Sequence, residues 1–525
     1  EISLMAGNSR FYITTPIYYV NDVPHIGHMY TTLACDVIAR FKRLDGWDVR
    51  FLTGTDEHGQ KVQKAAAAAG IGPQEFADRV SENFRELAAL MKFSNDDFIR
   101  TTEERHKRAC TVLWQRLVER GAIYLETYGG WYAVRDEAFY AESELVADGR
   151  GGRLAPTGAP VEWVEEPSYF FRLSAWGERL LRFYEANPDF ILPVSRRNEV
   201  VSFVEGGLQD LSISRTTFDW GVPVPGDPAH VMYVWVDALT NYLTAAGFPD
   251  TESEGFHKWW PADLHMVGKD ILRFHAVYWP ALLMAAELAP PRRVFAHGWW
   301  TNEGQKISKS LGNVIDPKEL VDRYGLDAVR YFMLREVPFG QDGDFSHKAM
   351  VGRINGDLAN DFGNLAQRVL SMISRYCDGR IPAPNALSPE DLSLLDSAAG
   401  PLLDRVRALL DRQVLHSALV EVWEVIAAAN GYVARQAPWT LRKTDPERMR
   451  TVLYVAAETI RRLATLAQPF MPDSAGRMLD QLGVPAESRG FETISAEGVL
   501  LSDLPVPAPV GVFPRFIEDD RAASS

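Results

Sequence analysis

Two short motifs, far apart in the chain, hold the residues best suited to act on a polyphosphate. The first is His25-Ile26-Gly27-His28, and the second is Lys306-Ile307-Ser308-Lys309-Ser310. Imidazole N–H groups can donate hydrogen bonds to phosphate oxygens, and two lysines on a loop can neutralise a departing pyrophosphate. Gly27 leaves room for a base or ribose to approach the backbone. Either motif alone is common, but together they predict a nucleoside triphosphate site.

The sequence around the first motif predicts elements that suit this chemistry. Residues 10–20 are rich in β-branched and aromatic side chains and predict a buried strand, and the apolar side of 27–44 predicts a helix. A second strand is expected at 49–52 and a second helix at 61–69. The first motif therefore falls where a strand turns into a helix, whose N-terminus attracts phosphate. Strand, helix and strand of these lengths indicate a doubly wound parallel sheet of Rossmann type.

The rest of the chain divides by composition. Residues 117–197 carry glycines and prolines between short aromatic strands and predict a small β-rich insertion. The α/β pattern then returns, with strands expected at 231–235 and 264–267 and a helix at 272–288. Beyond residue 350 the sequence predicts an antiparallel helical bundle, followed by an extended proline-rich tail. The helices of the bundle are expected at 358–376, 389–413, 418–434 and 446–466.

Composition and charge exclude several classes of protein. The 525 residues carry 55 Lys and Arg against 70 Asp and Glu, so a nucleic acid could be met only by local basic patches. The three cysteines are widely spaced and form neither a disulfide framework nor a cysteine zinc site. No segment is apolar and long enough to span a bilayer, and the N-terminus lacks the pattern of a signal peptide. We therefore expect a cytoplasmic protein without a membrane partner.

The two motifs and several further blocks resemble the class I aminoacyl-tRNA synthetases, and among them the methionyl-tRNA synthetase family. The further blocks are TPIYYVN at 15–21, TGTDEHG at 53–59, LSISR at 211–215, YVWVDA at 233–238, GKDI at 268–271 with His275, and QAPW at 436–439. The resemblance covers nearly the whole chain. It implies an α/β Rossmann-type catalytic domain split by the insertion and followed by an all-α anticodon-binding bundle.

On this resemblance we expect five regions along the chain. Residues 5–116 and 198–295 would form the two halves of the catalytic domain, and 117–197 the connective insertion. Residues 296–350 would hold the lysine loop and the region that contacts the tRNA stem. Residues 351–525 would form the helical anticodon-binding domain with its extended tail.

The family implies a two-step reaction that uses ATP, Mg²⁺ and L-methionine. The methionine carboxylate attacks the α-phosphate to give methionyl-adenylate and pyrophosphate, and the methionyl group then passes to the terminal adenosine of initiator and elongator tRNA(Met). By resemblance, Arg215 steadies the reacting groups, and the phosphates are bound by His25, His28, Lys306 and Lys309. The nucleoside of ATP would lie against Gly27, Gly268, Asp270, Trp299 and Trp300.

The same matching implies two recognition sites. Asp56 would pair with the ammonium group of methionine, and a polarizable thioether gains from aromatic edges. The side chains that would enclose the thioether are Ile17, Tyr19, Trp235, Ala238, Leu239, Tyr242, Ile271 and His275, of which Leu239 stands where some relatives carry proline. Asn364, Arg368 and Trp439 would read the tRNA anticodon, because Arg and Asn bond base edges and an indole stacks on an unpaired base.

The sequence departs from many members of the family in the insertion. Those members carry a zinc knuckle of cysteines there, whereas residues 128–157 contain no cysteine and no histidine. We therefore expect no structural zinc, because these side chains supply no soft-ligand tetrahedral site. The insertion is also too short to hold the editing domain of the isoleucine, leucine and valine enzymes.

Three other functions remain open from the sequence. The chain could be a class I synthetase for another aliphatic amino acid, a tRNA-independent nucleotidylyltransferase, or a catalytically inactive tRNA-binding module. The sequence blocks that would line the amino-acid pocket count against the first function. The long helical region counts against the second. The intact histidines and lysines of the two motifs count against the third. No appended dimerisation module is visible, so we expect a monomer.

Overall fold

The computed structural model describes residues 9–20 and 23–519, and the chain forms two compact units. The first, here called the sheet unit, contains Arg10–Pro24 and Val49–His297. The second, here called the helical unit, contains the described residues 25–48 and 298–519. Asn21, the last residue of the TPIYYVN string, and the beginning of the region expected at 5–116 lie outside the described residues. No described helix is both long and apolar enough to cross a membrane.

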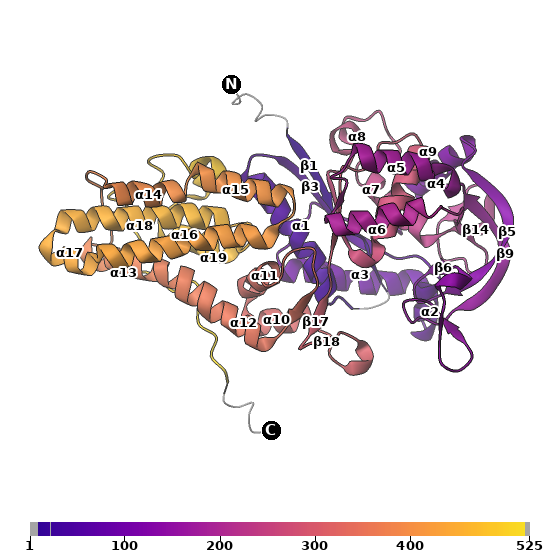
Figure 1. Cartoon of the computed structure of the whole chain (residues 1–525), viewed down its shortest axis with the longest axis horizontal. Coiled ribbons are helices and arrows are strands. Elements are labelled where there is room, and N and C mark those ends of the chain that lie inside the picture. Colours follow the sequence, from indigo (N-terminus) through magenta and orange to yellow (C-terminus); the bar gives the residue numbers. More distant parts are fainter. Residues whose placement is uncertain (1–8, 21–22, 520–525) are drawn as a thin grey trace. The chain divides into compact units, whose positions relative to one another are not determined.

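The sheet unit is built on a parallel sheet of seven strands in the order β10-β16-β15-β1-β3-β2, with β4 pairing β3. Figure 1 labels β1 and β3 of this sheet. Parallel strands are buried on both faces, and this is why they read as apolar, β-branched runs in the sequence. The sequence correctly predicts the doubly wound α/β class. The strands are β1 (Arg10–Thr14), β2 (Tyr18–Tyr19), β3 (Asp48–Asp56), β4 (Asp97–Arg100), β10 (Ile191–Leu192), β15 (Leu264–Gly268) and β16 (Val294–His297).

Three of the predicted elements in the sheet unit need correction. The single strand expected at 10–20 is interrupted at Pro16, which lacks the N–H that a continuous ladder needs. The strand expected at 231–235 is wrong, because the chain leaves β14 (Asp227–Met232) and begins helix α7 (Val234–Thr244) at once. The helix expected at 272–288 is a π-helical turn at Phe274–Tyr278 followed by α9 (Trp279–Ala285).

Most helices of the sheet unit bury their apolar sides in one core, whereas Val62 and Ala77, from the two helices that follow β3, lie in a separate small cluster. The core includes Trp114 and Leu113 from α4, Tyr242 from α7 and Trp279 from α9. The helices are α2 (Gln60–Ala68), α3 (Pro73–Leu90), α4 (Glu104–Glu119), α5 (Gly177–Ala186), α6 (Val194–Glu205), α7, α8 (Glu254–Trp259) and α9.

The insertion is β-rich, as predicted. Its main feature is a long antiparallel pair, β5 (Ile123–Ala133) with β9 (Glu162–Phe171), which Figure 1 shows as a curved ribbon. The short strands β6 (Ala138–Tyr140) and β11 (Leu211–Ser212) complete this sheet at its two edges. Small additional sheets are formed by β12 (Ser214–Arg215), β13 (Pro223–Val224) and β14, and by β7 (Val146–Ala147) and β8 (Arg153–Leu154).

The helical unit begins with α1 (Ile26–Leu44), whose contacts place it with the C-terminal part of the chain. A small sheet of β17 (Trp300–Asn302), β18 (Gln305–Lys306) and β19 (Gly343–Phe345) carries the lysine motif. Asp36 of α1 and Arg330 of α11 form a fully buried ion pair at 2.8 Å. The helices that follow the small sheet's first two strands are α10 (Pro317–Tyr324), α11 (Leu326–Arg335) and α12 (His347–Arg353).

The predicted bundle is confirmed, and its helices α13, α16 and α18 run side by side in Figure 1. The helix expected at 389–413 is two helices, because Gly400-Pro401 starts a new one. Proline at the first helical position, where no intrahelical N–H bond is lost, opens several members of the bundle. The helices are α13 (Asn364–Tyr376), α14 (Pro389–Ser397), α15 (Gly400–Asp411), α16 (Leu415–Gln436), α17 (Pro438–Thr444), α18 (Pro446–Ala467) and α19 (Pro472–Gln481).

Candidate active site

The two histidines of the first motif cap helix α1. His25 is the N-cap residue, and its Nδ1 accepts a hydrogen bond from the backbone N–H of Gly27 at 3.0 Å. The backbone N–H of His25 in turn donates to Nδ1 of His28 at 3.1 Å, and the two rings lie 4.0 Å apart. A Cβ on Gly27 would lie 2.9 Å from the His25 ring, so the tight arrangement requires glycine.

These hydrogen bonds decide which ring nitrogens carry protons. Removal from solvent, helped by the neighbouring His25, holds the pKa of His28 well below its usual value, so His28 is neutral at pH 7. Because Nδ1 of His25 and Nδ1 of His28 both accept, each neutral ring carries its proton on Nε2. The helix N-terminus therefore offers imidazole N–H donors together with its own positive dipole.

The lysine motif forms an exposed loop with an internal scaffold. Asn313 organises it: its Oδ1 accepts from the backbone N–H of Ser308 at 2.9 Å, and its Nδ2 donates to the carbonyl of Lys306 at 3.0 Å. The hydroxyl of Ser308 accepts from the N–H of Leu311 and so caps the short helical turn Lys309–Leu311. Lys306 and Lys309 are both exposed on this loop.

The lysine loop and the first motif meet within the helical unit. The backbone N–H of Ile26, the first residue of α1, donates to the carbonyl of Ile315 at 3.3 Å, just after the loop. The two tryptophans that precede the loop differ in their exposure to solvent. Trp299 is 48% exposed, whereas Trp300 is buried and packs against Tyr30 of α1 at 5.5 Å between ring centroids.

In the sheet unit, Asp56 at the end of β3 is a buried carboxyl with an unsatisfied oxygen. Among the described residues its Oδ1 has no hydrogen-bond partner. Burial, with the nearby charges of Asp237, Glu137 and Glu57, raises the pKa of Asp56 well above its usual value, and a backbone hydrogen bond from His58 opposes this. A cationic group placed here would satisfy the oxygen and stabilise the ionised carboxylate.

The neighbouring carboxyls are already partnered, which sets Asp56 apart. Glu57 accepts from the Arg100 guanidinium at 2.7 and 2.8 Å. Glu137 accepts from the hydroxyl of Tyr19 and from the backbone N–H of Lys61, both at 3.2 Å. Burial raises the pKa of Glu137 to about 7.

Helix α7 and the turn after β15 bring several predicted thioether contacts together. The hydroxyl of Tyr242 lies 2.7 Å from Nε2 of His275, and Nδ1 of His275 lies 2.9 Å from the carbonyl of Ile271. Burial lowers the pKa of His275 to about 4, so the ring is neutral and bridges the two groups. Trp235 stacks on Phe274 at 4.0 Å and meets His275 edge-on. Leu239 and Ala238 are buried, while Ile17, Tyr19 and Ile271 are partly exposed beside the core.

Arg215 and Gly268 are two further predicted site residues, and both lie in the sheet unit. Arg215 is only 2% exposed, lies among the rings of Tyr132, Phe139 and Tyr233, and donates from Nη1 to the carbonyl of Ser214. Its Nε and Nη2 have no hydrogen-bond partner among the described residues. Gly268 ends β15, and a Cβ there would lie 2.6 Å from Oδ1 of Asp270.

The predicted anticodon residues gather on the bundle. Asn364 and Arg368 lie one turn apart on α13, and the Arg368 guanidinium is 5.7 Å from the ring centroid of Trp439 on α17. Trp439 is 43% exposed. This indole is therefore not a core side chain, and its surface is open to a stacking partner.

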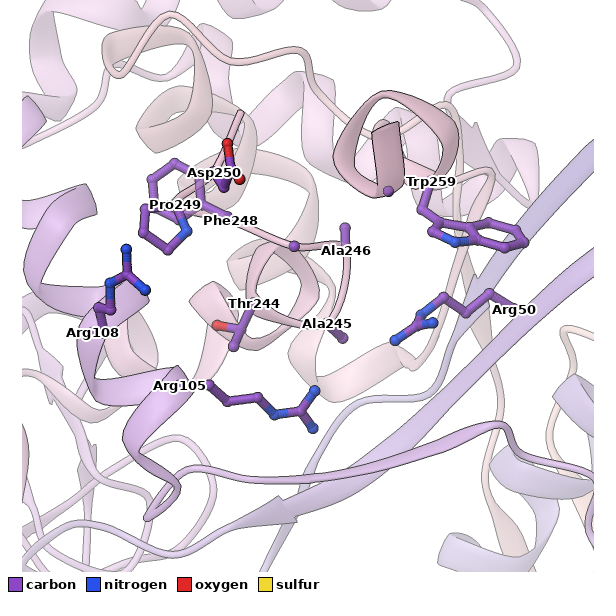
Figure 2. A pocket seen from close by; sticks show the side chains of 12 residues that line it. Arg50, Arg105, Arg108, Thr244, Ala245, Ala246, Phe248, Pro249, Asp250 and Trp259 are labelled. Carbon is purple, nitrogen blue, oxygen red and sulfur yellow. The ribbon is translucent and has the colours of Figure 1, made fainter. Parts of the chain in front are cut away.

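A hollow of about 440 Å³ in the sheet unit contains none of the predicted site residues (Figure 2). It is lined by Arg50, Arg105, the end of α7 and Trp259. Both arginines are paired with Asp97. The hollow lies near the start of β3, whereas ligands of parallel sheets bind at the carboxyl ends of the strands. It is therefore not the candidate site.

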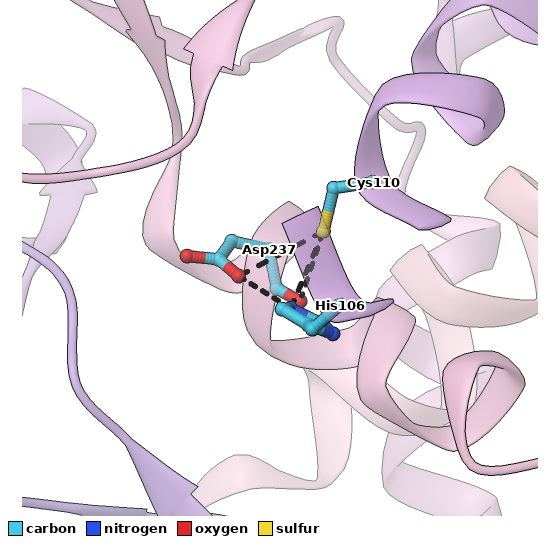
Figure 3. Close-up of side chains that lie close together, drawn as sticks. All are labelled: His106, Cys110 and Asp237. Carbon is cyan, nitrogen blue, oxygen red and sulfur yellow. Dashed lines mark hydrogen bonds and ion pairs between the residues drawn. The ribbon is translucent and has the colours of Figure 1, made fainter. Parts of the chain in front are cut away.

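Sequence reasoning missed a buried cluster of His58, His106, Cys110 and Asp237, part of which Figure 3 shows. His106, Cys110 and Asp237 carry potential metal ligands within 4.8 Å of one another. Their donors are engaged in hydrogen bonds, however, with Nε2 of His106 2.7 Å from Oδ1 of Asp237. Burial, reinforced by Asp237, raises the pKa of Cys110 well above its usual value and keeps it a thiol, whereas zinc binds thiolate.

We therefore expect no tightly bound structural zinc. Elemental analysis of protein purified without a metal-affinity step should show well below one zinc per chain, and treatment with a chelator, followed by its removal and assay with added Mg²⁺, should leave aminoacylation intact. The reasons are the lack of Cys and His in residues 128–157 and the engaged donors around Asp237. One full equivalent of zinc, or unfolding on chelation, would contradict this expectation.

Comparison with known proteins defines the class first. A family model described as tRNA synthetases class I (M) matches residues 11–370, and one described as the anticodon binding domain of methionyl tRNA ligase matches 381–524. A methionine–tRNA ligase of Brucella suis is 58% identical over 512 residues, covering 98% of this chain and 99% of that protein. One from Rickettsia bellii is 58% identical and covers 97% of this chain and 100% of its own.

A solved structure agrees with these relatives. Mycobacterium tuberculosis methionyl-tRNA synthetase in complex with methionyl-adenylate matches with a TM-score of 0.94 and 56% identity, covering 97% of this chain and 100% of that one. The chain belongs to the methionine–tRNA ligase family of class I tRNA synthetases. It is an ATP-dependent ligase with an α/β catalytic part and a helical anticodon-binding part, and a synthetase for another aliphatic amino acid is not favoured.

Proposed function

We propose that the chain activates L-methionine with ATP and transfers it to initiator and elongator tRNA(Met). The methionine carboxylate attacks the α-phosphate, pyrophosphate leaves, and the methionyl group then passes to the 3′-terminal adenosine. The observation that carries this proposal is Asp56 in the family's TGTDEHG block, a buried carboxyl with an oxygen that no described residue partners. An ammonium group is the cation that an amino-acid substrate brings to such a site.

For the first step, His25 and His28 donate Nε2–H to phosphate oxygens at the N-terminus of α1. Lys306 and Lys309 neutralise the charge that grows on the departing pyrophosphate. Catalysis is then positioning and electrostatic stabilisation, with no covalent intermediate on the protein. Mg²⁺ would arrive bound to the ATP phosphates, whose charge it neutralises, because it prefers oxygen ligands and retains water.

Other residues position the remaining parts of the substrates. Arg215 is proposed to steady the reacting groups through the guanidinium N–H groups that have no partner among the described residues. Gly27, Gly268 and Asp270 are proposed for the nucleoside, with Asp270 bonding the ribose. Of the two tryptophans, Trp299 is exposed and has the more accessible side chain for adenine. Trp300 is buried and would act through its position beside Trp299.

The thioether is proposed to lie against the edges of aromatic rings. Trp235, Tyr242 and His275 provide these rings, and aliphatic contacts come from Ile17, Ala238, Leu239 and Ile271. Tyr19 borders the same pocket and is held by Glu137. A sulfur atom contacts such edges favourably, whereas a shorter aliphatic side chain would leave the pocket partly unfilled.

For the second step, Asn364, Arg368 and Trp439 are proposed to recognise the anticodon. The expected division at 5–116, 117–197, 198–295, 296–350 and 351–525 stays a proposal for the functional regions. We also propose that the protein acts as a monomer in the cytoplasm, where its ATP and tRNA substrates are available. Cys35, Cys110 and Cys377 are buried and form no disulfide among the described residues, which suits a reducing compartment.

Amino-acid-dependent ATP–pyrophosphate exchange tests the proposed activity. Purified protein should support exchange with methionine and give far weaker exchange with leucine, isoleucine and valine. Charging should then be measured with tRNA(Met) and with a tRNA of another anticodon. Exchange that is fastest with a different amino acid would refute the proposal.

Replacing Tyr242 with phenylalanine should raise the KM for methionine about fivefold and leave the KM for ATP unchanged. The loss of one net hydrogen bond costs about 1 kcal/mol, and here it leaves Nε2 of His275 without its partner. Exchange kinetics measure both constants. Tyr432→Phe is the matched control, because it removes a buried tyrosine–aspartate hydrogen bond in the bundle and should change neither constant.

A further inference from the structure

The strongest unexplained feature of the sheet unit is the pair of histidines on one buried carboxylate. Oδ2 of Asp237 lies 2.6 Å from Nδ1 of His58, and its Oδ1 lies 2.7 Å from Nε2 of His106 (Figure 3 shows the second contact). Asp237 is 0% exposed, and both rings are buried as well. The two ring nitrogens in these contacts, Nδ1 of His58 and Nε2 of His106, face a carboxylate that can only accept hydrogen bonds. Each of them therefore carries a proton.

We infer that Asp237 is a positioning residue for Asp56 and so sets the affinity for the substrate ammonium. The inference rests on the proposed function. His58 follows Asp56 by two residues, so the position of its backbone constrains the segment that carries the Asp56 carboxylate. The ring of the same His58 is fixed by Asp237, which stands on α7. One carboxylate thus ties the segment that carries the ammonium ligand to the helix that carries the thioether contacts.

The surroundings show why a carboxylate is needed at this position. Burial opposes ionisation of Asp237, but the charges and hydrogen bonds of His58 and His106 outweigh it and hold the pKa of Asp237 below its usual value. An asparagine could accept from one histidine only, and its NH₂ group would face the N–H of the other. His58 would then turn away, and the segment that carries Asp56 would lose its anchor on α7.

The partner positions support an anchoring role for this cluster. His106 is held from its other side by Thr244, whose Oγ1 is 3.0 Å from Nδ1. His58 meets Trp220 edge-on at 5.3 Å, and Trp220 donates to the carbonyl of Glu57 at 2.6 Å. The backbone around Asp56 is therefore braced on both sides of His58, and Asp237 is the side-chain anchor common to β3, α4 and α7.

The test compares two competitive inhibitors of exchange in wild type and Asp237→Asn. Methioninol has the ammonium and the thioether, whereas 4-(methylsulfanyl)butanoic acid has the thioether but no ammonium. We expect Asp237→Asn to raise the Ki of methioninol about tenfold and to leave the Ki of the deamino acid within about twofold. The KM for ATP should not change. Asp391→Asn is the matched control, since Asp391 is also a buried, doubly bonded aspartate but lies in the bundle.

A second pair of variants keeps the test valid if Asp237→Asn does not fold. In His58→Asn the amide N–H can replace Nδ1–H toward Asp237, so methioninol binding should be largely retained. His58→Ala removes the anchor and should weaken it about tenfold. Equal weakening of both inhibitors, or equal behaviour of His58→Asn and His58→Ala, would overturn the inference. If wild type itself bound no methioninol, the proposed function would fail instead.

Discussion

Lys309→Ala should lower kcat for methionine-dependent ATP–pyrophosphate exchange about 100-fold, with the KM for methionine changed by no more than a few-fold. The lysine is proposed to meet charge that develops on the departing pyrophosphate, so the interaction is strongest in the transition state. Loss of one preorganised donor of this kind costs on the order of 3 kcal/mol, and each 1.4 kcal/mol is about tenfold in rate.

The structure makes this experiment specific. Asn313 holds the loop through backbone groups of Lys306 and Ser308, so truncation of Lys309 leaves that scaffold in place. Lys318→Ala is the matched control: it removes an exposed lysine just beyond the loop, one that pairs with Asp322. The control should exchange at the wild-type rate. If Lys309→Ala keeps its kcat and only the KM for methionine rises, the proposed role is wrong.

The local geometry of the proposed phosphate site follows from the sequence. His25, Gly27 and His28 lie within one helical turn, and their hydrogen bonds follow the N-cap pattern that the residue types allow. The same holds for the lysine loop, in which Ser308, Asn313 and Lys306 are close along the chain. Local chemistry of this kind is visible in a sequence before any fold is known.

The helix that carries several of the proposed methionine contacts was harder to predict. Residues 231–235 are β-branched and aromatic, and a short apolar run does not distinguish a buried strand from a buried helix. The structure ends a strand at Met232 and begins α7 at Val234. In the bundle, Gly400-Pro401 is a sequence signal for the start of a helix, and α15 begins there. The expectation of a single helix at 389–413 did not take this signal into account.

The cluster around Asp237 could not be predicted from this sequence alone. His58, His106 and Asp237 come from three separate elements, and His58 and Asp237 are 179 positions apart. A single sequence holds no signal for such pairing, since any buried histidine can be satisfied by many partners. The same reason hides Glu137, which reaches Tyr19 from the insertion, 118 residues away.

Trp439→Ala should cripple tRNA charging and leave methionine-dependent exchange nearly unchanged. The indole is 43% exposed beside Arg368, which suits stacking on an unpaired base. Loss of such a stacking face costs about 1–3 kcal/mol, so the KM for tRNA should rise between about fivefold and 150-fold. Poorer docking against Asn364 and Arg368 would add to this loss.

A measurement of Tm distinguishes a role of Trp439 in tRNA recognition from a role in the stability of the fold. Because Trp439 is 43% exposed and is not part of the buried core, its truncation should leave Tm near that of the wild type. Trp423→Ala is the contrast, because Trp423 donates from Nε1 to the carbonyl of Asp357 and packs against Tyr331 and Phe362, so its loss should lower Tm. A fall in Tm for Trp439→Ala, without a rise in the KM for tRNA, would assign the indole to packing. Equal charging by wild type of tRNAs with and without the methionine anticodon would refute the anticodon role itself.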